Sequence, residues 1–200
     1  MTVKTIDYFF ATVSPWAYLG HDRFVAMTRA AGATVRVKPM DLGEIFPVTG
    51  GLPLAKRAPQ RQAYRLVELQ RFSDHVGVAL VPQPAHFPVN GNAAAALIIA
   101  ADEAAGAAAA LGLAGRVCGA IWAEQRNVAD LAVLRALLAE PGLPAPLADR
   151  AGDPAIGARY AAYTAEALAA GVFGAPSYVV AGEVYWGQDR LDFVERRLLA

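Results

Sequence analysis

The sequence predicts an α/β fold in which a mixed four-stranded sheet is flanked by helices and carries an all-helical insert. Residues 1–40 have the pattern strand, helix, strand, and residues 151–200 have the pattern helix, strand, strand, helix. Residues 41–150 show helical spacing of apolar side chains or loop composition. These observations place the sheet at the two ends of the chain and the insert between them.

Composition and charge are those of a globular protein. The 200 residues are 56% hydrophobic and carry 18 basic and 18 acidic side chains. This balance, without a run of like charges, gives no indication of nucleic acid or an anionic membrane as partner. The most apolar stretch, 93–101, is far shorter than the ~20 residues that cross a bilayer.

Cys118 is the single cysteine, so the chain can form neither an internal disulfide nor a Cys-x-x-Cys redox pair. A lone thiol is typical of reducing compartments, and the first residues lack the apolar core and cleavage site of a secretory signal. We therefore expect a cytoplasmic protein in which Cys118 is a buried core residue.

The N-terminal unit begins with the apolar run Ile6–Phe10, which predicts a buried strand. Ser14 followed by Pro15 predicts a helix start, because serine caps helices and proline suits their first position. Gly32 ends that helix, and Val35–Pro39 is the next strand. Two strands joined by a helix predict parallel pairing with a right-handed crossover.

The middle of the chain predicts helices separated by loops. Prolines and glycines between Leu42 and Pro59 favour loop with at most short helical turns. The other predicted helices are Gln60–Val76, with Tyr64, Val67, Leu69 and Phe72 spaced for burial, then Asn92–Leu111, Val117–Arg126 and Asp130–Leu138. Gly112 and Gly115 mark the expected break between the second and third of these helices.

The last quarter returns to the α/β pattern. Its predicted elements are helix Ala155–Ala170, strands Ser177–Val180 and Glu183–Trp186 joined at Gly182, and a helix from Asp189. Joining this ββα unit to the N-terminal βαβ unit gives the thioredoxin-like arrangement. Residues 1–40 and 151–200 would form the thioredoxin-like domain and residues 41–150 the helical insert.

Ser14 is the first candidate for chemistry, because a helix N-terminus after a strand stabilises anions. The segment Ser14–Ala17 has no cysteine at either end, which excludes disulfide exchange at this place. A hydroxyl beside the positive helix end suits lowering the pKa of a thiol brought by a ligand. The alternative is that Ser14 serves only as a helix cap.

Three other segments are candidate ligand contacts. A cis bond before Pro176 would expose the backbone of Ala175 to a peptide-like ligand, although an ordinary turn proline is the alternative. Asp189 could receive an ammonium group, or could only cap a helix. The basic residues Lys56, Arg57, Arg61 and Arg65 could bind a carboxylate, or could form a solvated helix face.

Metal and nucleotide chemistry have no support in the sequence. His21, His75 and His86 lack metal-ligand spacing, and only His86, in a loop, is kept as a pocket candidate. The chain also has no glycine-rich nucleotide motif and no Gly-x-Ser-x-Gly elbow. We therefore expect no metal.

Several segments together resemble the 2-hydroxychromene-2-carboxylate isomerases and the kappa-class glutathione transferases. The resemblance covers nearly the whole chain, with its segments in the family's order. The segments are Asp7–Phe10 (DYFF), Ser14–Leu19 (SPWAYL), Tyr64, His86–Asn90 (HFPVN), Thr164–Ala167 (TAEA), Gly171–Ser177 (GVFGAPS) and Trp186–Leu191 (WGQDRL).

The resemblance implies glutathione as cofactor. In the family, the serine matching Ser14 hydrogen-bonds the glutathione sulfur and favours its thiolate. The residue matching Ala175, before a cis-proline matching Pro176, pairs its backbone with the cysteine unit of the tripeptide. The pair matching Gln188 and Asp189 holds the γ-glutamyl end.

The resemblance also assigns residues on the side of the insert. A basic residue near Arg61 would neutralise a ligand carboxylate, although some relatives have lysine there. The family's asparagine is missing from the loop around 51–53. Trp16, His86 and Asn90 are the expected substrate-side residues, with Asn90 near the acid group of an aromatic substrate.

The implied function is glutathione-dependent cis–trans isomerisation in the catabolism of aromatic compounds, by a cytoplasmic and dimeric enzyme. Two alternatives remain at this point. One is a kappa-type glutathione transferase or peroxidase acting on other electrophiles. The other is a non-catalytic thioredoxin-like binding module.

Overall fold

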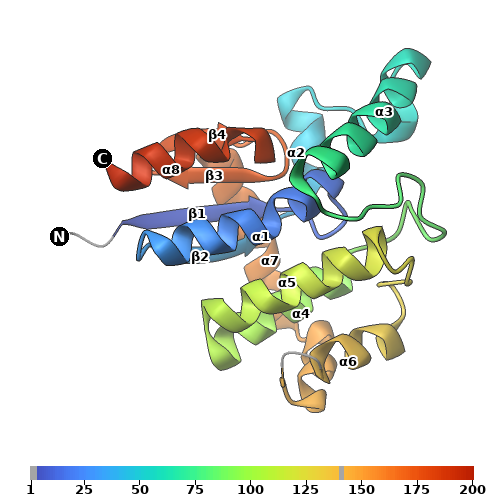
Figure 1. Ribbon diagram of the computed structural model, residues 1–200. Helices are drawn as coiled ribbons and strands as arrows, with labels where there is room; N and C mark the ends of the chain where they lie inside the picture. The colour runs from blue at the N-terminus through green and yellow to red at the C-terminus, as the bar shows by residue number, and fades with distance from the viewer. Residues whose placement is uncertain (1–3, 140–141) are drawn as a thin grey trace.

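The computed structural model describes residues 4–139 and 142–200 (Figure 1). Its single sheet has the strand order β2-β1-β3-β4. Strands β1 (Thr5–Phe10) and β2 (Thr34–Pro39) are parallel, whereas β3 (Ser177–Val180) and β4 (Glu183–Trp186) add antiparallel neighbours. The predicted α/β class, with a mixed four-stranded sheet, is confirmed.

The two faces of β1 are buried against different layers because its side chains alternate. Ile6, Tyr8 and Phe10 belong to the main hydrophobic core, together with residues of α1 (Pro15–Ala30) and α8 (Leu191–Leu199). Phe9 points to the opposite face, where it shares a second cluster with Ala167 of α7 (Pro154–Ala169). The sheet therefore lies between two helical layers, as the thioredoxin-like arrangement requires.

A two-residue turn joins β3 to β4 and sets their register. Val180 pairs with Glu183, so only Ala181 and Gly182 lie between the strands. Both have positive φ, 50° and 82°, as a type I′ hairpin turn demands. The predicted turn at Gly182 is confirmed, and the structure adds that Ala181 shares its left-handed backbone.

The described part of residues 41–150 forms five α-helices, and several of them lie below the sheet in Figure 1. Within the described part of residues 41–150 the chain forms no strand. The helices are α2 (Leu42–Thr49), α3 (Pro59–Val76), α4 (Asn92–Ala105), α5 (Ala107–Trp122) and α6 (Leu131–Ala139). None of the helices in the described residues is both long enough and apolar enough to span a membrane.

The expectation of loop after residue 42 is wrong, because α2 forms there in spite of Pro47. Asp41 caps the helix by accepting a hydrogen bond from the Gly43 N–H at 2.7 Å. Ile45 is completely buried in the second cluster, on the face of the sheet that carries Phe9. Burial of this side chain and the cap outweigh the one backbone hydrogen bond that proline removes.

The predicted break at Gly112 and Gly115 is also wrong. The chain turns at Gly106 instead, with φ of 81°, and α5 then runs without interruption through both glycines, so Val117–Arg126 is not a separate helix. At Gly115 an added Cβ would lie 2.9 Å from Cδ2 of His21. This glycine therefore lets α1 approach α5 closely, which is a packing role and not a helix stop.

Helix α3 buries less of its surface than its sequence predicts. Leu69 is fully buried, but Tyr64 and Val67 are 55% and 47% exposed. The helix contacts α1 along one edge, where Trp16 meets Phe72 edge-on at 5.6 Å between ring centroids. The opposite side of α3 has no packing layer over Tyr64 and Val67, so helical spacing overestimated the buried set.

Candidate functional site

Ser14 lies where the carboxyl end of β1 leads into the N-terminus of α1. Its hydroxyl oxygen accepts a hydrogen bond from the Ala17 N–H at 3.2 Å, so the predicted helix cap is confirmed. The same hydroxyl donates to the carbonyl oxygen of Ala175 at 3.3 Å, and the side chain is only 6% exposed. Ser14 therefore caps α1 and also contacts a second segment that the sequence placed at the site.

The segment around Pro176 brings the other predicted residues to the same place. The peptide bond between Ala175 and Pro176 is cis. The carbonyl oxygen of Pro176 accepts a hydrogen bond from the Gly187 N–H at 2.9 Å, which attaches the turn before α8 to this loop. Ala175, Pro176 and the start of the last helical segment thus form one wall beside Ser14.

Gln188 and Asp189 stand in a short 3₁₀ turn that precedes α8, so the helix predicted to start at Asp189 begins at Leu191. Gln188 is 3% exposed and lies against Gly20 of α1, where an added Cβ would be 2.5 Å from the Gln188 Cβ. Asp189 is exposed and pairs with Arg190 at 2.5 Å instead of capping the helix. Its carboxylate therefore stays accessible to a ligand.

The residues expected on the insert side are less closely gathered. Trp16 sits in the first turn of α1 and connects it to α3 through Phe72. Arg61 on α3 and His86 in the loop before α4 are both exposed. Neither is hydrogen-bonded to Ser14, so the structure brings the sheet-side residues together and leaves these two exposed at the rim.

A cavity of about 360 Å³ opens beside the β1–α1 loop and contains Asn90. Loop residue Thr12 borders it and holds the opposite wall, because the Thr12 hydroxyl donates to the Gly91 carbonyl at 3.1 Å. Asn90 is itself fixed by accepting a hydrogen bond from the Asn92 N–H at 2.9 Å. The predicted substrate-side residue Asn90 therefore lines a cavity that is also bordered by Thr12, two residues before Ser14 in the chain.

Sequence reasoning missed most residues that line this cavity, among them the polar side chains of Thr12, Asp41 and Tyr160. Burial, with the nearby Asp41 carboxylate as the second cause, raises the pKa of the Tyr160 hydroxyl above its ordinary value. Tyr160 is therefore neutral at physiological pH and can donate a hydrogen bond into the cavity. The sequence did hold one signal for this side of the cavity. Asp41 has the residue type of a helix cap, and a prediction of α2 would have placed it at the start of that helix.

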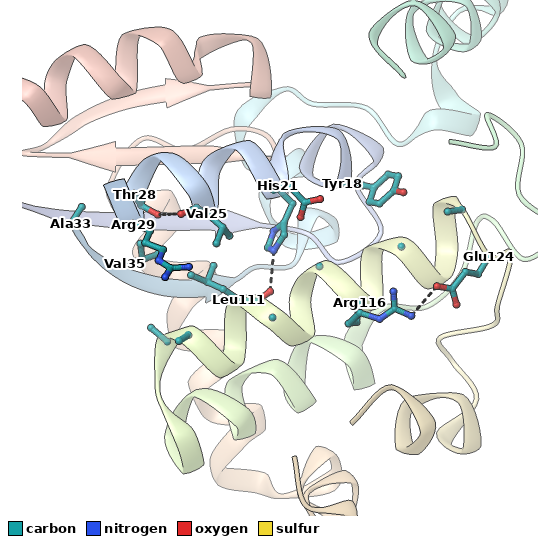
Figure 2. Close-up of a pocket in the computed structure, with 17 residues that line it drawn as sticks. Tyr18, His21, Val25, Thr28, Arg29, Ala33, Val35, Leu111, Arg116 and Glu124 are labelled. Carbon is teal, nitrogen blue, oxygen red and sulfur yellow. Dashed lines mark hydrogen bonds and ion pairs between the residues drawn. The ribbon is translucent and has the colours of Figure 1, made fainter. Parts of the chain in front are cut away.

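A second cavity, of about 770 Å³, lies between α1 and α5 and holds none of the predicted site residues (Figure 2). In Figure 2, His21 points from α1 toward α5, where its Nε2 is 2.9 Å from the Leu111 carbonyl oxygen. Burial lowers the pKa of His21, so the ring is neutral and Nε2 carries the donated proton. This histidine joins the two helices and stands apart from the Ser14 site.

Cys118 is buried, as expected, at 1% exposure. Its thiol donates to the Thr12 carbonyl oxygen at 3.4 Å, and burial raises the pKa of the thiol to about 12. Among residues 4–139 and 142–200, no group of three or more His, Cys, Asp or Glu side chains is arranged to hold a metal ion. A thiolate at this site must therefore come from a ligand.

Native protein at pH 8 is expected to react with a thiol-labelling disulfide reagent at less than ~1% of the rate of the unfolded chain. Both burial and the raised pKa keep Cys118 protonated, and only the thiolate reacts. The measurement is the time course of release of the coloured thiol, with and without guanidinium chloride. Rapid labelling of the native protein would show that Cys118 is itself available as a nucleophile.

The comparisons with known proteins agree with this geometry. The family model of the DSBA-like thioredoxin domain matches residues 5–199. A 2-hydroxychromene-2-carboxylate isomerase of Pseudomonas putida is 30% identical over 199 residues, covering 95% of this chain and 92% of the relative. Among solved structures, a 2-hydroxychromene-2-carboxylate isomerase superposes with a TM-score of 0.83 at 26% identity, over 96% of this chain and 93% of that one.

A more distant structure shares the fold alone. The cytosolic disulfide reductase DsbM from Pseudomonas aeruginosa, solved with GSH, has a TM-score of 0.69 at 20% identity. The match covers 98% of this chain and all of that one, 100%. Because a family model and a relative at 30% identity both cover nearly the full length, this chain is an enzyme of the DSBA-like thioredoxin domain family and belongs with the 2-hydroxychromene-2-carboxylate isomerases.

Proposed function

We propose that this chain catalyses the glutathione-dependent cis–trans isomerisation of a 2-hydroxychromene-2-carboxylate type substrate in aromatic compound catabolism. The observation that carries the proposal is the Ser14 hydroxyl, which lies at the N-terminus of α1 and contacts the carbonyl of Ala175 beside a cis-proline. The names of the relatives support the substrate class.

The site fits glutathione by the chemistry of its donors. Ser14 and the free N–H groups of α1 would stabilise the thiolate of the ligand. The backbone of Ala175, next to Pro176, would pair with the cysteine unit, and Gln188 with Asp189 would hold the γ-glutamyl ammonium group. Arg61, at the rim on α3, would approach a carboxylate of the tripeptide.

Bound glutathione would supply a thiolate that adds reversibly to a conjugated carbon of the substrate, allows rotation about the resulting single bond, and leaves unconsumed. The chain's own contribution is to keep that sulfur ionised near neutral pH through Ser14 and the helix dipole. The Ser14 hydroxyl, which donates to the Ala175 carbonyl in this structure, would turn to the bound sulfur, and its burial would strengthen that hydrogen bond by excluding water.

The 360 Å³ cavity is the proposed place of the aromatic substrate. Asn90 and the neutral hydroxyl of Tyr160 would donate hydrogen bonds to its oxygen atoms, while Trp16 and His86 would border its entrance. The wall at Thr12 is held to Gly91 and so keeps this hollow next to the Ser14 loop.

We further propose that the enzyme is cytoplasmic and forms a homodimer. The reduced, buried thiol of Cys118 supports a reducing compartment. An exposed aromatic pair, Phe173 and Trp186, whose ring centroids are 4.8 Å apart, supports an apolar interface at the edge of the sheet. We also propose that residues 41–150 act as an insert domain on a frame made of 1–40 and 151–200.

Titration of the protein with glutathione, followed by thiolate absorbance in the ultraviolet, tests the proposed function. Bound glutathione is expected to ionise near neutral pH instead of at the ordinary thiol pKa of about 8.5–9. Isomerisation of 2-hydroxychromene-2-carboxylate should then reach equilibrium with glutathione well below the substrate concentration.

Two other outcomes would contradict the proposal. Consumption of glutathione in proportion to substrate, with a conjugate or oxidised glutathione detected by mass spectrometry, would indicate the transferase or peroxidase alternative. Absence of glutathione binding would favour the non-catalytic binding module.

A further inference from the structure

Arg65 is a second basic side chain on α3, one helical turn beyond Arg61. The Arg65 guanidinium is half-buried over two aromatic rings, 5.4 Å from the Phe87 centroid and 5.7 Å from the Trp122 centroid. The two rings are themselves in contact, with centroids 4.8 Å apart. Arg65 therefore sits in an aromatic corner that fixes the plane and position of its guanidinium.

This cation has no carboxylate to neutralise it within residues 4–139 and 142–200. Another cation, Arg57, acts on Arg65 electrostatically, and the Arg57 Nε donates to the Leu52 carbonyl oxygen at 2.8 Å. Burial first, and then Arg57, lower the pKa of Arg65 to about 10. A half-buried guanidinium that has a second cation acting on it and no carboxylate paired with it favours the binding of an anion.

The corner is attached to the Ser14 loop through both of its aromatic residues. Phe87 precedes Gly91 by four residues, at most about 14 Å of chain, and Gly91 accepts a hydrogen bond from Thr12 at 3.1 Å. Trp122 follows Cys118 by one helical turn, about 6 Å, and Cys118 donates to Thr12 at 3.4 Å. Thr12 is two residues before Ser14, so hydrogen bonds attach both segments that carry the corner to the Ser14 loop.

Arg61 differs from Arg65 in ways that matter for binding. Arg61 is exposed and makes no ring contact, so its side chain must be ordered when a ligand binds. Arg65 is already ordered by its two rings, and a rigid fork loses less entropy when it binds a planar anion.

We propose that Arg65, assisted by Arg57, binds the carboxylate of a ligand of the Ser14 site. The inference rests on the proposed function and names a subsite for it. A planar carboxylate matches the fork of a guanidinium through two parallel hydrogen bonds. Two ligands could supply that group, glutathione through its glycyl end and the aromatic substrate through its acid group.

Calorimetric titration of four probes into the wild type, Arg65→Gln and Arg65→Lys tests the subsite. The probes form two pairs that differ in one carboxylate. The first pair is glutathione and γ-glutamylcysteine, which lacks the glycyl carboxylate. The second pair is 2-hydroxycinnamate and its methyl ester, and both are titrated with and without glutathione. Arg71→Gln, an exposed arginine on the same helix, is the matched control. Arg65→Lys keeps the positive charge, so it still tests the subsite if Arg65→Gln fails to fold.

Arg65→Gln is expected to weaken one carboxylate probe by about 10- to 100-fold, the effect of a lost hydrogen bond between charged groups. The partner probe without that carboxylate should bind as it does to the wild type, and Arg65→Lys should fall between. Loss confined to glutathione would assign the glycyl end, and loss confined to 2-hydroxycinnamate would assign the aromatic acid.

Equal affinity of all variants for each probe, or no binding of either carboxylate probe by the wild type, would overturn the inference. The proposed function is tested separately in the same data. If the wild type does not bind glutathione, that function fails, while Arg65-dependent binding of free 2-hydroxycinnamate still supports the subsite. If glutathione binds and ionises in every variant, the function stands whatever Arg65 does.

Discussion

Replacing Ser14 with alanine is expected to lower kcat/KM for isomerisation by about 10²- to 10³-fold, the effect of removing one hydrogen-bond donor aimed at a developing or resident anion. The loss should be accompanied by a shift of the rising limb of the pH–rate profile to higher pH. The sign follows from the thiolate: without the hydroxyl its charged form is less stable, its pKa rises, and a higher pH is needed to ionise it. Steady-state rates from pH 5 to 9 measure both effects.

A matched control separates this chemistry from the structural role of Ser14. The serine also caps α1, so Ser14→Ala should cost about 1 kcal/mol of unfolding free energy. Asp153 caps α7 in the same way, accepting from the Ala155 N–H at 2.9 Å, and lies outside the site. Asp153→Ala should lose similar stability and keep full activity. If both variants lose activity equally, Ser14 acts only as a cap.

The parts of the fold that were predicted correctly depend on signals close in sequence. The cap at Ser14 and Pro15, the apolar run of β1 and the glycine at the β3–β4 turn each specify backbone geometry within a few residues. Because the strand and helix units are local, their combination into one mixed sheet follows from handedness and from apolar burial.

The parts that were missed depend on contacts between distant segments. Helix α2 forms because Ile45 is buried against residues more than 100 positions away, and no local pattern reports that contact. Gly115 lies inside a helix because His21 packs on it, and only the folded structure distinguishes this from a break. Distant contacts, not composition, decide these positions.

The same distinction applies to the site. Ser14, Ala175 and Pro176 carry local backbone signatures, so their assembly could be anticipated from sequence and resemblance together. The other parts of the site join residues that are distant in sequence. Arg65 contacts Phe87 and Trp122, which are 22 and 57 positions away, and Tyr160 shares its cavity with Asp41, more than 100 positions away. A basic run in the sequence cannot distinguish Arg65, placed on two rings, from exposed Arg61.

Gly20→Ala is expected to produce the second large effect, by disturbing the site through packing. The added Cβ would lie 2.5 Å from the Gln188 Cβ and 3.5 Å from the Tyr178 hydroxyl oxygen, and the first distance is too short for any real contact. Because Gln188 belongs to the 3₁₀ turn and is buried against α1, it can only move together with that turn. Overpacking of this kind costs about 1–3 kcal/mol, more than the ~1 kcal/mol that alanine gains in a helix.

The displaced turn carries Gln188 and Asp189, so the variant should bind glutathione about tenfold more weakly, the effect of one lost hydrogen bond to a charged group. At saturating glutathione kcat should be nearly unchanged, since Ser14 is not moved directly.

Gly157→Ala is the matched control. Gly157 lies in α7 with no atom within 4 Å of the added Cβ, so the variant should gain about 0.5–1 kcal/mol of unfolding free energy without altering the affinity for glutathione. Thermal unfolding and glutathione titration of both variants decide the matter. If Gly20→Ala loses stability but binds glutathione normally, the last 3₁₀ turn does not hold the γ-glutamyl end, and only the wall formed by Ser14, Ala175 and Pro176 would remain as the proposed tripeptide site.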